Sequence, residues 1–346
     1  MKRNILVKSF CLSALVLLAS AGRGWCGWAD ISTDFPAGSW GGFARSGGAV
    51  ATDGWLETTF LDWPQDLNAS PYGYLMYNNN IASYTAAGFN LPFTLGAVWA
   101  IIVTDVVQDM EYQVRPFEVK PGETARVARA SVEYLHEVFR KRPKRGDKWG
   151  ALVWHLATPY FVRAMRAVRC RFDAIEVDRL RVKPVVKLTG EFYLQTVEGD
   201  PNYNIHRWLE AEGAEVYPAA ITVWFDYLLR LAGQEFEDHI GIDRHARLKL
   251  AGIRAGQSLL RWTYARMRRA MGGVPHELPD QYELRRLAEP YYHSRLRGGE
   301  GDMLIGKAIW AHQNKLAHMI CELSPYSCMP NTMSIGAMSG VIGKHP

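Results

Sequence analysis

The segment Lys183-Pro184-Val185-Val186-Lys187-Leu188-Thr189-Gly190-Glu191-Phe192-Tyr193 has the composition of a buried strand. After it come a polar loop, a helical stretch from Asn204 to Glu212, Gly213 as a helix stop, and a second strand over Ala214–Tyr217. Strand, loop, short helix, glycine and strand in this order indicate a βαβ unit, in which the two strands lie parallel. The segment therefore predicts an α/β fold.

Ligands of such folds bind beyond the carboxyl ends of the parallel strands. Thr189-Gly190-Glu191 and the loop from Glu198 to Asn204 follow the first strand, so Glu191 and Asn204 are candidate binding residues. A structural use of Glu191, as a helix cap or in a salt bridge, is the alternative.

Most of the remaining chain predicts helices that cover the sheet. The patterns indicate one short strand at Arg115–Val119 and helices at Leu95–Met110, from Thr124 or Glu123 to about Arg142, at about Trp149–Cys170 with a kink at Pro159, and two or three within residues 222–272.

A second strand-to-helix junction carries the candidate metal ligand. Ala317–Leu323 has a strand pattern, a proline-bounded loop follows, and a helix opens near Pro330. Cys328 is then expected at the carboxyl edge of the sheet, beside a helix N-terminus. A helix N-terminus or a bound metal lowers the pKa of a thiol, and the thiolate is the form that ligates iron or zinc. The alternative for Cys328 is a small, buried, apolar side chain.

Composition and charge exclude several classes of protein. The 346 residues are 48% hydrophobic, which excludes wholesale disorder, and the formal net charge is only +5. Part of that charge lies in one run, Arg140–Arg145, which is more typical of a solvated loop between helices than of a nucleic-acid patch. We therefore expect no nucleic-acid partner. The five cysteines are too few and too scattered for a disulfide framework, and no zinc-finger spacing occurs.

The N-terminus has the form of a secretory signal. Basic residues precede an apolar run at Phe10–Ala19, and Ala19-Ser20-Ala21 suits a signal peptidase. An apolar run of about ten residues is too short to cross a bilayer, so no membrane span is expected. The sequence divides into a signal-like, unmatched segment at 1–55, a partial first α/β lobe with helices at 56–180, and a second, truncated lobe at 181–346.

The segment Gly301-Asp302-Met303-Leu304-Ile305-Gly306-Lys307 fits the first seven positions of a phosphate-binding P-loop. The eighth residue is Ala308, which has no hydroxyl for Mg²⁺, and no apolar strand pattern precedes the segment. We therefore exclude a nucleotide site here.

Four segments, in the same order, resemble the family of 2-hydroxyacyl-CoA dehydratase and benzoyl-CoA reductase subunits. The resemblance is greatest to the branch of CoA-substrate-specific enzyme activase-related proteins, and it covers residues 95–335. The segments are Val103–Val106 with Arg115–Thr124; Val177–Arg179 with Lys183–Val186, Gly190–Tyr193, Asn204 and Glu210–Val216; Tyr291-Tyr292 with Arg297–Gly301; and His318-Met319 with Ser324–Pro330.

The resemblance implies Rossmann-like parallel-sheet lobes with helical cover that hold a [4Fe-4S] cluster through cysteines. It also implies a partner, an ATP-hydrolysing activase of the actin/hexokinase-like superfamily, which delivers a low-potential electron for radical chemistry on an acyl-CoA. Cys328 lies in the family's Pro-aromatic-x-Cys-Met-Pro motif, so the resemblance makes it a metal ligand. Further cleft candidates are Glu191, Asn204, Arg297, Gly298, Gly299 and Glu300.

The chain also departs from the family pattern. The Cys-Gly-Pro-Cys-like stretch of relatives is missing, and the resembling region contains only Cys170, Cys321 and Cys328, whereas a cluster takes about four ligands. The chain ends soon after the cysteine motif, so we expect a fragment. A low-potential cluster belongs in a reducing cytoplasm, so the signal-like segment is expected to be an artefact of the gene start.

Three classes of function stay open at this point. They are an iron–sulfur component of a dehydratase-like enzyme, a non-catalytic scaffold or binding subunit of the same fold, and a secreted protein of unrelated role.

Overall fold

A computed structural model of the chain describes residues 49–52, 55–58, 91–143, 148–199, 202–296, 299–325 and 328–345. The packing of the Cα atoms separates two units, one of Met1–Ala14 with Thr94–Pro346 and one of Leu15–Phe93. Within the smaller unit the structure describes an antiparallel hairpin of β1 (Ala49–Thr52) and β2 (Trp55–Thr58), together with residues 91–93 at the start of a helix. The predicted signal-like residues 1–21 lie outside the described residues.

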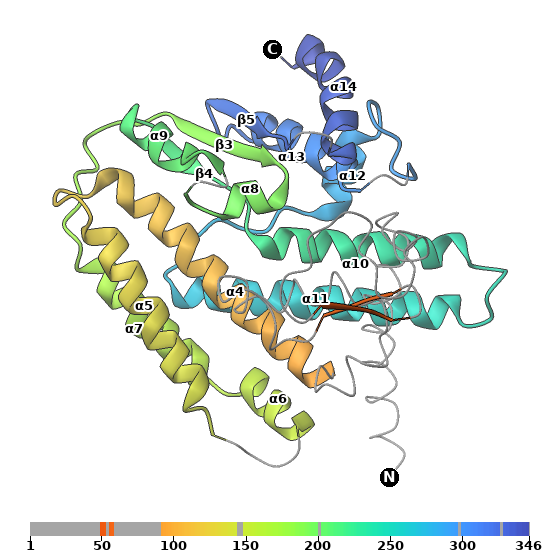
Figure 1. Cartoon of the computed structure of the whole chain (residues 1–346), viewed down its shortest axis with the longest axis horizontal. Coiled ribbons are helices and arrows are strands. Elements are labelled where there is room, and N and C mark those ends of the chain that lie inside the picture. Colours follow the sequence, from red (N-terminus) through yellow and green to blue (C-terminus); the bar gives the residue numbers. More distant parts are fainter. Residues whose placement is uncertain are drawn as a thin grey trace. The chain divides into compact units, whose positions relative to one another are not determined.

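The described residues of the larger unit are mostly helical (Figure 1). Its helices are α4 (Leu91–Val114), η4 (Arg115–Phe117), α5 (Glu123–Arg140), α6 (Lys148–Ala157), α7 (Tyr160–Asp173), α8 (Phe192–Thr196), α9 (Ile205–Ala211), α10 (Ile221–Asp238), α11 (Ala246–Ala270), α12 (Gln281–Ala288), α13 (Gly301–Gln313) and α14 (Met329–Lys344). Its strands are β3 (Val185–Gly190), β4 (Glu215–Tyr217) and β5 (Met319–Leu323). No helix that the structure describes combines the length and the hydropathy that a bilayer span requires.

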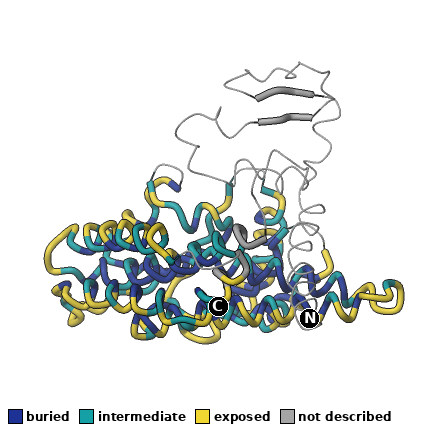
Figure 2. The backbone as a smooth tube through the Cα atoms, turned by 90° about the horizontal axis from the view of Figure 1, so that it is seen from below, coloured by how far each residue is buried: buried dark blue, intermediate teal, exposed yellow. Residues whose placement is uncertain are grey.

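The helix predicted across Trp149–Cys170 is in fact two helices. α6 ends at Ala157 and α7 begins at Tyr160, so Pro159 separates two helices instead of kinking one. Residues 222–272 contain all of α11 and all of α10 except Ile221, which makes two helices, the lower of the two expected numbers. Figure 2 shows buried and exposed residues alternating along the helices, as amphipathic helices require.

The three strands of the larger unit form one parallel sheet, with β3 between β4 and β5. The chain runs from β3 to β4 through α8 and α9, so the predicted βαβ unit and the α/β character are confirmed. β5 pairs with the other edge of β3. Parallel sheets bind ligands beyond the carboxyl ends of their strands, which makes the ends of β3 and β5 the place to look for a site.

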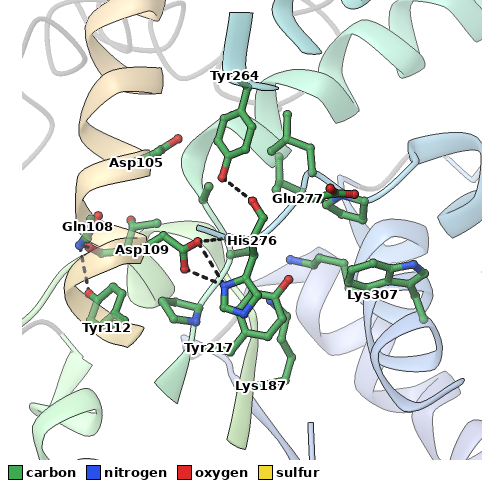
Figure 3. A pocket seen from close by; sticks show the side chains of 18 residues that line it. Asp105, Gln108, Asp109, Tyr112, Lys187, Tyr217, Tyr264, His276, Glu277 and Lys307 are labelled. Atoms are coloured by element: carbon green, nitrogen blue, oxygen red, sulfur yellow. Dashed lines mark hydrogen bonds and ion pairs between the residues drawn. The ribbon is translucent and has the colours of Figure 1, made fainter. Parts of the chain in front are cut away.

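The two faces of this sheet differ in polarity, because side chains alternate along a strand. Val186 and Leu188 of β3 pack in an apolar core with Leu209 of α9. Lys187 therefore points to the opposite face, where it is the register partner of Tyr217 in β4. Side chains of α4 and α13 line a cavity on that opposite face (Figure 3).

Gly190 ends β3 at a position that requires glycine. Its φ is +99°, and a Cβ there would overlap the carbonyl oxygen of Leu323 in β5. The backbone N–H of Glu191 donates to that same oxygen at 2.9 Å. Gly190 thus lets β3 and β5 pair up to their carboxyl ends, and it fixes the place of Glu191.

The strand predicted at Arg115–Val119 is wrong over its first three residues, whereas Glu118 forms an isolated antiparallel bridge with Val177. Those first three residues form η4, with Pro116 in the first turn. Arg115 is buried, its Nε lies 2.9 Å from both carboxylate oxygens of Glu210, and its guanidinium also pairs with Glu111 and Glu198. This ion cluster holds the backbone at the end of α4 and overrides the local strand pattern.

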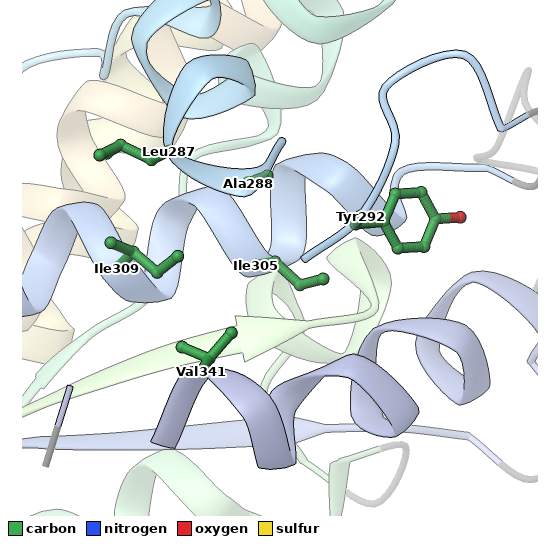
Figure 4. Close-up of a cluster of buried hydrophobic side chains, with 6 residues drawn as sticks. All are labelled: Leu287, Ala288, Tyr292, Ile305, Ile309 and Val341. Carbon is green, nitrogen blue, oxygen red and sulfur yellow. The ribbon is translucent and has the colours of Figure 1, made fainter. Parts of the chain in front are cut away.

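α13 is enclosed by its neighbours along most of its length. Leu287 and Ala288 of α12 and Val341 of α14 pack with Ile305 and Ile309 of α13 in one apolar cluster (Figure 4). The segment that matches part of a P-loop is the first half of this helix, and not a phosphate-binding loop.

Candidate functional site

Cys328 lies where the sequence predicts it, at the carboxyl edge of the sheet. β5 ends at Leu323, and Cys328 is the N-cap residue of α14. The Sγ of Cys328 lies 3.6 Å from Oδ1 of Asn331. The Nδ2 of Asn331 donates to the carbonyl oxygen of Leu323 at 2.9 Å. Asn331, which is buried, therefore ties the cysteine turn to the end of the strand.

The electrostatic surroundings of Cys328 differ from the predicted ones. Burial raises the pKa of the Cys328 thiol, the backbone N–H of Asn331 lowers it, and the carboxylates of Glu300 and Glu191 raise it again, with a net rise. Burial and the two carboxylates therefore outweigh the lowering effect that a helix N-terminus has on the pKa of a thiol. The expectation of a lowered thiol pKa is wrong for the protein without a metal.

Gly299 and Glu300 lie against the cysteine turn. Gly299 has a φ of +84°, and a Cβ there would overlap Cγ of Pro330. Its carbonyl oxygen accepts a hydrogen bond from the hydroxyl of Tyr227 at 2.8 Å. Glu300 is the N-cap residue of α13 and is only 6% exposed. The glycine-rich segment and the cysteine motif are therefore in direct contact.

Glu191 belongs to the same edge. Its Oε2 accepts the backbone N–H of Leu194 at 2.9 Å, so Glu191 caps α8 and the structural alternative is confirmed. Burial raises the pKa of Glu191, while its hydrogen bonds and the charge of Lys307 lower it by less. The Glu191 carboxylate also raises the pKa values of Cys328 and Glu300, so the helix-capping side chain interacts electrostatically with both groups.

Lys307 of α13 supplies the positive charge of this edge. Burial lowers its pKa to about 8, and the carboxylates of Glu300, Glu322 and Glu191 oppose that shift. Among the residues that the structure describes, the ammonium of Lys307 makes no hydrogen bond or ion pair. The edge therefore holds three carboxylates, one ammonium and one thiol.

The other candidates of the sequence lie apart from these groups or outside the described residues. Asn204 is exposed at the start of α9, in the left-handed conformation with φ 53°, and its side chain does not cap the helix. Asn204 is therefore a turn residue, a role that suits asparagine because it tolerates the left-handed conformation. Arg297 and Gly298 are not among the described residues.

The four resembling segments touch one another in the fold. Arg115 of the first segment pairs with Glu210 of the second at 2.8 Å. The Nδ1 of His318, in the fourth segment, accepts the backbone N–H of Val185 in the second at 3.0 Å. The close approach of Gly299 to Pro330 joins the third segment to the fourth.

The described residues of this edge do not fit a [4Fe-4S] cluster by themselves. Such a cluster takes about four cysteine ligands, and no metal-binding group of three or more Cys, His, Asp and Glu side chains occurs in the described ranges. Cys321 packs with the apolar core on the α9 face, and Cys170 is exposed on α7. Cys328 is thus the one cysteine found at this edge within the described part, so further ligands would have to come from elsewhere.

The cavity on the polar face of the sheet is a feature that the sequence analysis missed. Its volume is about 30 Å³, and its lining includes Lys187, Tyr217, Lys307, Asp109 and His276 (Figure 3). The one sequence signal for it is a lysine inside the apolar run Val-Val-Lys-Leu of β3. Asp109 and His276 are far apart in the chain, and no motif connects them.

Comparison of the chain with known protein families, with curated proteins and with solved structures found no match. The resemblance of the four segments therefore stays a prediction.

Proposed function

We propose that this chain is an iron–sulfur component similar to 2-hydroxyacyl-CoA dehydratase subunits. In this proposal it works in a reducing cytoplasm, receives a low-potential electron from an ATP-hydrolysing activase, and serves radical chemistry on an acyl-CoA. Cys328 is one ligand of a [4Fe-4S] cluster, and the other ligands come from residues outside the described part or from a partner chain. The parallel sheet of β3, β4 and β5 belongs to one of two Rossmann-like lobes.

One observation carries the proposal. The segments that resemble the family are far apart in the sequence, yet they contact one another in the fold. Three of the candidate residues, Cys328, Glu300 and Glu191, act on one another at the carboxyl ends of β3 and β5. Ligands of parallel sheets bind at this place.

The acidic character of the edge also supports a positively charged occupant. The carboxylates of Glu300 and Glu191 make no ion pair with a described residue, and both raise the pKa of Cys328. A metal ion beside a thiol has the opposite effect and favours the thiolate. Iron at Cys328 would therefore offset the repulsion that these carboxylates impose on the thiolate.

A second candidate function is a non-catalytic subunit of the same fold that binds the activase. The observation that favours it is the lone position of Cys328, since Cys321 packs against the apolar core on the α9 face of the sheet and Cys170 is exposed on α7.

Anaerobic purification with iron and acid-labile sulfide analysis separates the two functions. The iron–sulfur proposal predicts a brown chromophore that air bleaches. Cys328→Ala is expected to lose the iron and the visible absorption, whereas Cys170→Ala, the matched control, is expected to keep both. A wild-type chain that takes up neither iron nor sulfide after anaerobic reconstitution leaves only the binding subunit. Equal iron content in both variants refutes the assignment of Cys328 as a ligand.

A further inference from the structure

Two buried lysines face the small cavity on the polar face of the sheet (Figure 3). Lys187 lies in the middle of β3 and is 3% exposed, and Lys307 comes from α13 and is 2% exposed. Within the described part of the chain, neither amine makes a hydrogen bond or an ion pair. The Nζ of Lys187 lies 3.4 Å from the ring centre of Tyr217. A buried charge without a hydrogen bond or an ion pair is unfavourable, so this arrangement favours a neutral amine at Lys187, whereas the carboxylates of Glu300, Glu322 and Glu191 favour the charged form of Lys307.

The electrostatics of the pair point the same way. Burial lowers the pKa of Lys187 well below its usual range, and the charge of Lys307 lowers it further, against the smaller opposite effect of Asp109. A desolvated lysine beside a second cation is the arrangement that makes a lysine nucleophilic at neutral pH. Lys187 therefore offers a free electron pair next to open space.

A carboxylate-bound imidazole lies at the same cavity. Asp109 accepts the backbone N–H of His276 at 2.5 Å and faces its Nδ1 at 2.9 Å. The Nε2 of Gln113 lies 3.1 Å from the same Nδ1, so the ring of His276 is held by two side chains of α4. The ring centres of His276 and Tyr217 are 3.6 Å apart, so His276 and the amine of Lys187 lie on opposite faces of the same tyrosine ring.

The cavity reaches solvent on the side of His276. His276 is only half-buried and its neighbour Glu277 is exposed, and both residues line the cavity. A small molecule can therefore enter beside the imidazole. A volume of about 30 Å³ is small, so the site takes only small organic groups as it stands.

We propose that this cavity is a carbonyl-binding site, in which the Lys187 amine forms an imine with a small aldehyde or ketone. The nitrogen of Lys187 attacks the carbonyl carbon, and the π electrons of the carbonyl move to its oxygen, which takes up a proton. The resulting carbinolamine loses this oxygen as water, the nitrogen gives up its proton, and a C=N bond replaces the C=O bond. One water is released and nothing is oxidised or reduced.

Reductive trapping with acetaldehyde and sodium cyanoborohydride at pH 7 tests this site. The reductant converts an imine into a stable secondary amine, and peptide mass spectrometry measures the labelled fraction of each lysine. An ordinary lysine, with a pKa near about 10.4, is only roughly 0.04% neutral at pH 7. We expect Lys187 to be labelled at least about tenfold faster than Lys315, an exposed lysine. Faster labelling of Lys315 overturns the proposal.

Two substitutions test the mechanism behind the label. Lys307→Met removes the neighbouring charge, so the pKa of Lys187 rises and its labelling slows, by about tenfold for each unit that the pKa rises above the assay pH. Lys249→Met is the matched control, because Lys249 pairs with Asp243 away from the cavity, and it is expected to leave the labelling of Lys187 unchanged. Unaltered labelling of Lys187 in a Lys307→Met protein with the wild-type circular dichroism spectrum contradicts the proposal. Neither iron nor an activase is needed, so the result is independent of the iron–sulfur proposal.

Discussion

The contact between Gly299 and Pro330 joins the glycine-rich segment to the cysteine motif, and Gly299→Ala tests it. Alanine at a φ of +84° is strained by about 1–2 kcal/mol. Its Cβ would also overlap Cγ of Pro330 and lie 2.9 Å from Cβ of the same residue. Overpacking of this kind costs about 1–3 kcal/mol. The expected loss in the free energy of unfolding is therefore about 2–5 kcal/mol.

Gly122→Ala is a matched control for this substitution. Gly122 has almost the same φ, +83°, but a Cβ there would meet nothing within 4 Å. The backbone strain and the loss of chain freedom in the unfolded state are shared by both variants, so they cancel in the difference. Gly122→Ala is expected to cost about 1–2 kcal/mol, and the remainder in Gly299→Ala measures the overlap with Pro330.

Urea unfolding followed by tryptophan fluorescence gives both values. Pro330→Ala removes Cγ, so Gly299→Ala is expected to cost less in that background, with a coupling of about 0.5–3 kcal/mol. Equal losses for Gly299→Ala and Gly122→Ala, or the absence of coupling to Pro330, would refute the contact.

Three further predictions concern charge and titration. In the metal-free protein, alkylation of Cys328 by iodoacetamide is expected to accelerate with pH around a midpoint above the usual thiol pKa of about 8.5. Glu300→Gln is expected to lower that midpoint, because the Glu300 carboxylate raises the pKa of the thiol. A wild-type midpoint below about 8.5 contradicts the described surroundings. Burial raises the pKa of Asp105 to about 6, above about 3.9 for the unfolded chain, so its contribution to stability is complete below about pH 3.9 and is lost as pH rises through about 6. Urea unfolding at pH 4 and pH 7 should show wild type losing up to about 3 kcal/mol relative to Asp105→Asn, and a constant difference would contradict this. Arg115→Met leaves the partly buried carboxylates of Glu210, Glu111 and Glu198 without the cation that they share, and it should destabilise the fold by about 3–5 kcal/mol. The side chain of Arg207 is half-exposed, so Arg207→Met should cost less than about 1 kcal/mol in the same urea assay. Similar losses for the two variants would show that the ion cluster of Arg115 does not stabilise the fold.

The part of the fold that could be predicted is the part in which local signals agree. β3, α9, Gly213 and β4 follow one another within a short stretch, and Gly213 has the left-handed φ of +95° that a helix stop uses. The junction of β5 and α14 was predicted for the same reason, because an apolar strand, prolines and a helix opening lie side by side. The strand at Arg115–Val119 failed over its first three residues, where the side chain of Arg115 pairs with Glu210 of α9, a contact that local pattern cannot reveal.

The candidate site was predicted in position but not in its electrostatics. Cys328 is at the expected edge, and the helix N-terminus beside it is real. The direction of its pKa shift depends on Glu300 and Glu191, which reach the thiol from two other elements of the fold. The cavity of Lys187 escaped prediction for a similar reason, because β3, α4, α13 and the loop of His276 meet there only in three dimensions.

The central claim is that the sulfur of Cys328 binds iron, and differential alkylation of the wild-type chain tests it most directly. Protein reconstituted with iron and sulfide under anaerobic conditions is treated with iodoacetamide, next to the same protein after the iron has been removed by a chelator. The account predicts that Cys328 is protected in the iron-loaded protein and reacts once the iron is gone, while the exposed Cys170 reacts equally in both. Alkylation of Cys328 at the same rate with and without iron would contradict it.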